Sequence, residues 1–205
     1  MALIYENKVP VAYRKEFIAK VREICSKLGI NPNWLMAIMY FESAGTFSAS
    51  IKSPATNATG LIQFMPDTAK YLGTTVAALA KMTAVQQLDY VYKYYKNYTN
   101  QLNSYIDTYL VTFFPAAVGK GDGYLIQTSS LPASLIAKQN PSFDTNKDGK
   151  IYVWEVKKIM LSKLPSEWLK DGSFTLLYKS YKHYIWIGAA AITAGSAILF
   201  YYGRK

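Results

Sequence analysis

One carboxylate, Glu42, stands where an apolar helical segment meets a polar loop, in the stretch YFESAG at residues 40–45. Trp34, Ile38 and Phe41 precede it on the same segment. Burial disfavours the charged form of a carboxyl group and raises its pKa, and the negative end of a helix acts in the same direction. A carboxyl that stays protonated near neutral pH can act as the general acid in cleavage of a glycosidic bond. The alternative is a solvated glutamate on the surface, and its position alone does not exclude that interpretation.

A second motif, GLIQFMP at residues 60–66, begins eighteen positions after Glu42, and TAKYLG follows it at residues 68–73. Together with the helical pattern W-L-x-A-I-x-x-F before Glu42, these motifs resemble the SLT family of lytic transglycosylases. The members of that family are lysozyme-like enzymes that cleave peptidoglycan. The resemblance is dense from about residue 17 to residue 73 and extends to about residue 123.

The resemblance implies roles for individual residues. The catalytic glutamate of the family falls on Glu42, and Ser43 is the serine that follows it and helps to hold the site. Gln63 takes the place of a glutamine that hydrogen-bonds substrate. Gly60 would let the backbone approach the glycan closely, because a glycine has no Cβ atom.

At other positions the resemblance does not fix the role of the residue. Phe64 and Met65 are expected either to line the cleft as apolar surface for sugar rings or to pack in the core. The third motif of the family is usually A-Y-N-A-G, and the best match here is FFPAA at residues 113–117, which lacks both the tyrosine and the asparagine. Tyr109 is one helical turn earlier and could substitute, since residues i and i+4 share a helix face. The residue that faces Glu42 is therefore expected to be Tyr109 or Phe114.

The number of available carboxylates bears on the reaction. Hydrolytic glycosidases normally use two carboxylates, and neither Asp67 nor Asp89 is placed by a motif. One carboxylate fits the non-hydrolytic route that the resemblance implies, in which the peptidoglycan MurNAc–GlcNAc bond is cleaved to a 1,6-anhydro product. The alternatives are lysozyme-type hydrolysis, or an inactive membrane-anchored protein that binds the cell wall.

A calcium loop is predicted in the stretch DTNKDGKIYVWE, residues 144–155. Hard oxygen donors occur at the spacing of an EF-hand loop, with a glycine at the sharp turn. The predicted ligands are the side chains of Asp144, Asn146, Asp148 and Glu155 and the backbone carbonyl of Lys150. We expect one structural Ca²⁺; the alternative is a loop that keeps this shape without a metal.

Residues 184–202 contain no charged side chain, and this stretch is long enough to span a bilayer as one helix. Aromatic residues at both ends and basic residues outside them suit the two membrane interfaces. The alternative is a buried core helix. Because the N-terminal residues show no secretory signal, we expect an enzyme delivered in a phage virion, together with other virion proteins, to open the wall for genome entry; a host envelope enzyme is the other possibility.

The remaining pattern predicts an all-α, lysozyme-like fold. Helical spacing and capping signals recur through the chain, with a catalytic core at residues 1–126, a calcium-loop region that completes it at 127–164, and a linker at 165–183. Lys and Arg number 23 against 13 Asp and Glu. This excess favours an anionic partner such as cell-wall polymer or membrane. No basic block supports nucleic-acid binding, and the single cysteine excludes an internal disulfide.

Overall fold

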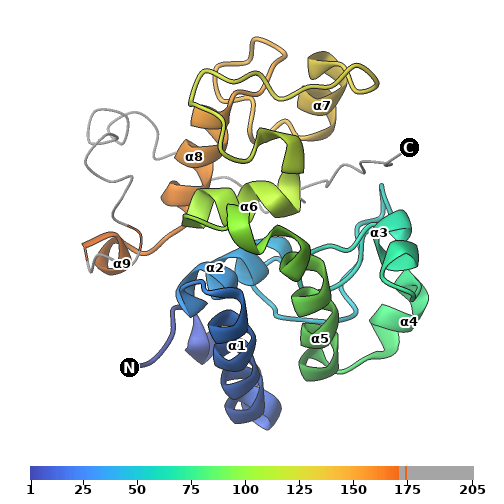
Figure 1. Ribbon diagram of the computed structural model, residues 1–205, viewed down its shortest axis with the longest axis vertical. Coiled ribbons are helices and arrows are strands. Elements are labelled where there is room, and N and C mark those ends of the chain that lie inside the picture. The colour runs from blue at the N-terminus through green and yellow to red at the C-terminus, as the bar shows by residue number, and fades with distance from the viewer. Residues whose placement is uncertain (171–173, 175–205) are drawn as a thin grey trace.

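The structure is a computed structural model that describes residues 1–170 and residue 174. Within these residues the chain is helical, and extended backbone forms isolated bridges instead of strands. The all-α prediction is therefore confirmed for the described residues. The α-helices (Figure 1) are α1 Arg14–Leu28, α2 Pro32–Glu42, α3 Pro66–Tyr71, α4 Val76–Lys81, α5 Ala84–Tyr95, α6 Tyr105–Phe113, α7 Ala133–Gln139, α8 Val153–Ser162 and α9 Ser166–Lys170. Short 3₁₀ helices are η1 Glu6–Lys8, η2 Val11–Tyr13, η3 Lys96–Gln101 and η4 Pro115–Ala117.

Local signals explain where most helices begin and end. Gly29 ends α1 in the left-handed conformation, at φ 69°. The Asn31 side chain accepts a hydrogen bond from the Asn33 N–H, and a proline opens α2. Thr83 and Gln86 form the reciprocal capping box that starts α5. These caps satisfy N–H groups that have no partner within the helix.

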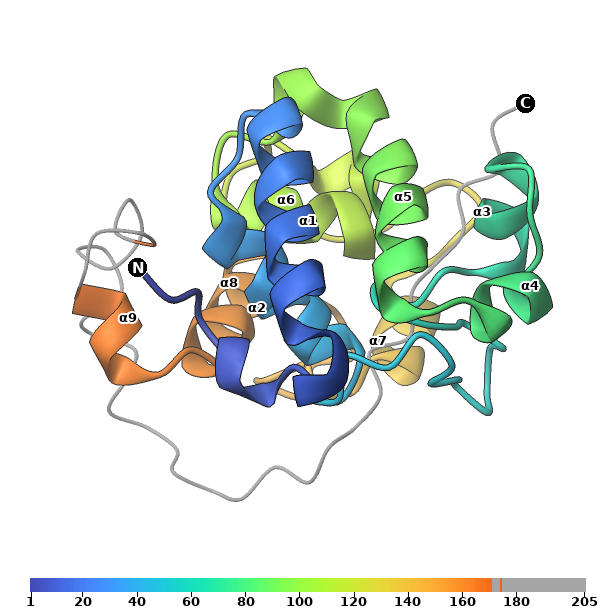
Figure 2. The same ribbon diagram turned by 90° about the horizontal axis from the view of Figure 1, so that it is seen from below.

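The central layer consists of α1, α2, α5 and α6. Helix α1 packs against both α2 and α5, and α2 packs against α6. Figures 1 and 2 show α1 and α5 side by side, with α3 and α4 flanking α5 on its outer side. Helix α2 thus lies between neighbours, and its C-terminal end is held in the middle of the molecule.

Residues after α6 share the same core. Phe143 lies 4.9 Å from Phe113 and 6.2 Å from Phe41 between ring centroids. Helix α8 adds Val156 and Met160 to the same buried cluster. The predicted calcium-loop region therefore packs directly against α6 and against α2, the helix that carries Glu42.

The predicted linker and membrane helix are only partly described. Residues 166–170 form α9, and Phe174 packs edge-on against Tyr105, with 5.0 Å between ring centroids. Of the residues that the structure describes, none belongs to a helix long and apolar enough to cross a bilayer. The predicted membrane segment, residues 184–202, lies outside the described residues.

Candidate active site

Glu42 is the last residue of α2, and the turn that follows fixes its position. The Gly45 N–H donates to the Tyr40 carbonyl over 2.7 Å. Ala44 and Gly45 both have positive φ, at 50° and 80°, so the backbone leaves the helix sharply. The Glu42 side chain is held at the end of a buried helix and is 5% exposed.

The surroundings of Glu42 favour its neutral form. Burial is the main cause that raises the pKa of this carboxyl well above its ordinary value, and the nearby Tyr109 hydroxyl acts in the opposite direction. Neither carboxyl oxygen makes a hydrogen bond of good geometry with the described residues, and neither does the Tyr109 hydroxyl. The Tyr109 hydroxyl is therefore a close neighbour of Glu42 without a hydrogen-bond partner among the described residues. Burial has the larger effect on the pKa of Glu42.

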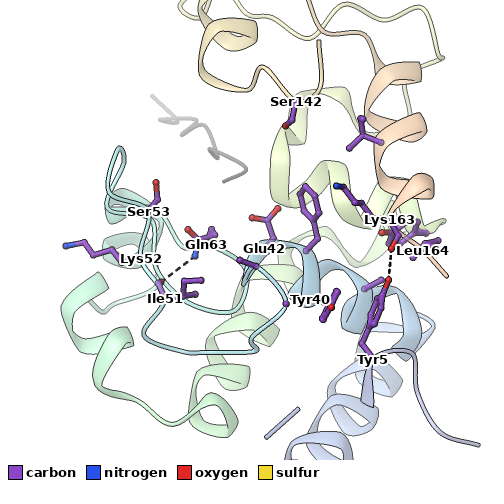
Figure 3. A pocket seen from close by; sticks show the side chains of 16 residues that line it. Tyr5, Tyr40, Glu42, Ile51, Lys52, Ser53, Gln63, Ser142, Lys163 and Leu164 are labelled. Atoms are coloured by element: carbon purple, nitrogen blue, oxygen red, sulfur yellow. Dashed lines mark hydrogen bonds between the residues drawn. The ribbon is translucent and has the colours of Figure 1, made fainter. Parts of the chain in front are cut away.

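Glu42 opens into a cleft of about 300 Å³. Figure 3 shows its carboxyl between two walls, one formed by residues 51–63 and the other by residues near α8. Ile51, Ser53 and Gln63 line the first wall. Tyr5, Tyr40, Phe41, Tyr105, Ser142, Ile159, Lys163 and Leu164 are among the residues of the rest of the cleft. A buried acid at the bottom of a cleft can protonate a bound ligand without competition from bulk water.

Ser43 and Gln63 organise the backbone around the acid. The Ser43 hydroxyl accepts a hydrogen bond from the Phe47 N–H over 2.8 Å, which holds the turn after α2. Gln63 has φ 51°, and its Nε2 donates to the carbonyls of Gly60 at 3.1 Å and Ile51 at 3.5 Å. With the amide nitrogen directed at the backbone, the Gln63 carbonyl oxygen is available as an acceptor for a ligand hydroxyl.

Several residues predicted to bind substrate lie elsewhere. Phe64 is 2% exposed and, with Met65, lines a separate cavity of about 20 Å³ beside the cleft. Phe114 is fully buried at the end of α6. The structure thus favours core packing for these aromatic side chains, and it places the Tyr109 hydroxyl, which the sequence offered as a substitute, beside Glu42.

Gly60 was expected to let the backbone approach the glycan, but its close neighbour is the side chain of Gln87. A Cβ atom at this position would lie 2.5 Å from Nε2 and 2.6 Å from Cδ of Gln87. The close approach is therefore to a protein side chain, and Gly60 is not among the residues that line the cleft.

Gln87 is a residue to which no sequence motif points. Its buried side chain accepts from the Leu61 N–H at 2.7 Å and donates to the carbonyls of Ala49 and Leu79, each at 3.0 Å. These contacts tie the loop that forms one cleft wall to α5 and to α4. The available signal was a glutamine on the apolar face of α5, next to Leu88 and one turn before Val91.

The predicted calcium loop is wrapped by its own hydrogen bonds. The carboxylate of Asp144 accepts from the N–H groups of Asp148 and Gly149, at 3.1 and 3.0 Å. Gly149 has φ 76°, which provides the sharp turn that the motif requires. The oxygens of Asp144, Asn146 and Asp148 are hard donors of the kind that Ca²⁺ takes.

Both carboxylate oxygens of Glu155 accept hydrogen bonds from backbone N–H groups. Glu155 is fully buried, and its Oε1 accepts from the N–H groups of Thr145 and Asn146, at 2.8 and 3.3 Å. Its Oε2 accepts from the Tyr152 N–H at 3.0 Å and closes the capping box that starts α8. Among the described residues, no three carboxylate, histidine or cysteine side chains are grouped closely enough to hold a metal.

Comparison with known proteins identifies the part of the chain that carries Glu42. Residues 20–118 match the family described as the transglycosylase SLT domain, whose members are lytic transglycosylases acting on peptidoglycan. No curated protein matches the chain. The matched span includes Glu42, Gln63 and Tyr109 and ends before the segment that contributes Ser142 and Lys163 to the cleft. Residues 20–118 thus form an SLT transglycosylase domain, of the family whose members are lytic transglycosylases that act on peptidoglycan.

Proposed function

We propose that Glu42 alone serves as acid and base in cleavage of the β-1,4 bond between MurNAc and GlcNAc, with a 1,6-anhydro sugar as product. The observation that carries this proposal is the cleft itself, where Glu42 is the one carboxylate among the described residues of the lining. Two-carboxylate hydrolysis needs a second group about 5–9.5 Å from the first.

The reaction follows from the protonation state of Glu42. Its proton passes to the glycosidic oxygen as the bond from that oxygen to C1 of MurNAc breaks. The carbonyl oxygen of the substrate N-acetyl group bonds to C1 and stabilises the developing cation. The Glu42 carboxylate then takes the proton of the 6-hydroxyl, whose oxygen attacks C1 and releases the N-acetyl group. Glu42 ends protonated, as it began.

Product analysis tests this route against its runner-up. Mass spectrometry of digested peptidoglycan is expected to show muropeptides that end in 1,6-anhydro-MurNAc. Products that end only in ordinary reducing MurNAc would establish lysozyme-type hydrolysis instead. Cell-wall zymography that shows no clearing would leave a wall-binding protein, for which the phenylalanine pair in the third motif is the supporting observation.

Tyr109→Phe is expected to lower kcat about 10- to 100-fold, because the nearby hydroxyl can stabilise the carboxylate that forms when Glu42 gives up its proton, and a hydrogen bond to a charged group is worth roughly 1.5–3 kcal/mol. The hydroxyl lowers the pKa of Glu42, so its removal raises that pKa further. Glu42 then stays protonated to higher pH, and the alkaline limb of the pH–rate profile moves upward. A profile whose alkaline limb does not move would show that Tyr109 does not act on the carboxyl during catalysis.

Calcium binding belongs to the same proposal, supported by the donor types and spacing in residues 144–155. Asp144, Asn146, Asp148, Glu155 and the Lys150 carbonyl would hold the ion, which would stabilise the loop and the start of α8. We expect calorimetry to detect Ca²⁺ binding with Kd below about 1 mM. Asp144→Ala should abolish that heat. Absence of binding by the unchanged protein at millimolar Ca²⁺ would show a metal-free loop.

The proposed setting is a membrane-anchored enzyme carried in a virion. The uncharged stretch at residues 184–202, with aromatic ends and basic flanks, supports the membrane anchor in this proposal. Proteomics of purified particles is expected to detect the protein. Its presence in the host envelope and absence from particles would favour a host enzyme.

A further inference from the structure

Lys163 lines the same cleft as Glu42, although it lies beyond the residues that match the SLT domain. It follows the last residue of α8 and caps that helix. Figure 3 shows its side chain directed from the end of α8 into the cleft, on the side of Glu42. Lys52 also lines the cleft, but its amino group points outward at the opposite end.

The backbone of Lys163 is held in place by the N-terminal segment. The Tyr5 hydroxyl donates to the Lys163 carbonyl over 2.5 Å. The Tyr5 ring stacks on Tyr40, with centroids 3.8 Å apart and planes 11° apart. Burial is the main cause that raises the pKa of Tyr5 to about 12, so the hydroxyl keeps its proton at physiological pH. The next residue, Leu164, is buried in the core. Lys163 therefore has a fixed backbone and an exposed side chain.

The cleft carries a net positive charge before substrate binds. Glu42 is the single acidic residue among the described residues of its lining, and burial disfavours the charged form of that carboxyl. Lys52 and Lys163 are the two cationic residues among the described residues of the cleft lining. Among the described residues, no carboxylate forms an ion pair with the Lys163 amino group. A ligand that brought a carboxylate to this position would gain a charge-assisted hydrogen bond.

We propose that Lys163 forms an anion subsite that binds a carboxylate of peptidoglycan and so sets the position of the glycan strand relative to Glu42. This proposal rests on one part of the proposed function, namely that the cleft binds the glycan strand of peptidoglycan. Two sources supply the same chemistry: the acidic groups of the stem peptide, and the lactyl carboxylate that is free where the stem has been removed.

The kinetic test compares Lys163→Gln with two matched variants. Lys163→Arg keeps the cation, and Lys70→Gln removes an exposed lysine of α3 that does not line the cleft. On intact peptidoglycan, Lys163→Gln is expected to raise KM about 3- to 10-fold with little change in kcat, as for loss of one exposed charged contact. Lys163→Arg and Lys70→Gln should both keep the KM of the unchanged protein.

Substrate variants separate the two sources of carboxylate. Amidation of all substrate carboxyls should remove the difference between the unchanged protein and Lys163→Gln. A difference that persists on strands stripped of stem peptides assigns the subsite to the lactyl carboxylate, and one that disappears there assigns it to the stem. The proposal is overturned if Lys163→Gln has the KM of the unchanged protein on acidic substrate, or an equal rise in KM on amidated substrate.

A binding measurement keeps this inference separate from the proposed reaction. In the Glu42→Gln background, calorimetry with soluble stem-bearing and stripped glycan fragments is expected to show a loss of affinity of about 3- to 10-fold on Lys163→Gln, as for one charged contact. The loss of affinity would support the subsite even if product analysis excluded the anhydro route. Equal affinity of the two variants for every acidic fragment would overturn the subsite without bearing on Glu42.

Discussion

Glu42→Gln is expected to reduce kcat on purified peptidoglycan by about 10²–10⁴-fold, the usual contribution of general acid–base catalysis. Glutamine has the same shape as the protonated acid but can neither give its proton to the glycosidic oxygen nor take one from the 6-hydroxyl. The measurement is release of soluble muropeptides over time. Because the substitution leaves the cleft lining otherwise unchanged, affinity for the glycan should be retained.

Thermal unfolding as a function of pH provides the control. The pKa of Glu42 is raised above its ordinary value of 4.5, so the folded protein keeps a proton that the unfolded chain releases. The contribution of Glu42 to stability therefore falls as pH rises above that value towards the folded-state pKa. Glu42→Gln does not carry this cost and should be more stable at pH 7 by roughly 1–3 kcal/mol, with the advantage lost below about pH 4.

Two results would contradict this account of Glu42. Muropeptide release by Glu42→Gln within a few-fold of the unchanged protein would remove the residue from the reaction. A stability difference that did not depend on pH would show that the carboxyl titrates normally in the folded protein. The two measurements are independent, since one reports on the reaction and the other on the environment of the carboxyl.

Gly60→Ala is expected to lower the free energy of unfolding by about 3–5 kcal/mol, a loss typical of a substitution that disrupts a buried network. The new Cβ atom would lie 2.6 Å from Cδ of Gln87. Gln87 cannot move aside without losing its hydrogen bonds to Leu61, Ala49 and Leu79. Urea or thermal unfolding measures the effect, and a chain of this size should lose about 10 °C or more in Tm.

Gly73→Ala is the matched control, because Gly73 has a similar positive φ of 76° but no atom within 4 Å of the position that a Cβ would take. It should cost only about 1 kcal/mol, from the backbone conformation. In the Gly60→Ala/Gln87→Ala double variant the steric conflict is absent, so the two losses should not add. A Gly60→Ala cost no larger than that of Gly73→Ala would show that the approach of Gln87 does not constrain this position.

The helices and their ends were largely predictable, since they depend on residues close together in the sequence. The caps at Asn31, Thr83 and Ser104 each act within three residues, and each side chain accepts a hydrogen bond from a backbone N–H in the first turn of its helix. Helix α4 is less predictable, because its six residues are too few to show a periodic pattern. Helix α5 ends at Tyr95, and the chain continues as the 3₁₀ helix η3.

The cleft wall was less predictable, because its parts come from distant positions. Phe64 and Met65 belong to the GLIQFMP motif, yet they line a small side cavity and not the cleft. Nothing near Gln87 in the sequence indicates that its amide lies against Gly60. A buried amide with three partners can be recognised only when the segments that supply those partners have been placed.

The sequence by itself determined the helical class, the end of α2 at Glu42 and the family of the SLT domain, because these follow from local periodicity, caps and motif spacing. Only the tertiary structure decided how strongly Glu42 is buried, since that depends on α6, on Phe143 and on the residues after it. The same is true of Tyr5 and Lys163, which are 158 positions apart and joined by one hydrogen bond. Long-range packing brings them to the cleft, and a one-dimensional pattern does not encode which distant surfaces will meet.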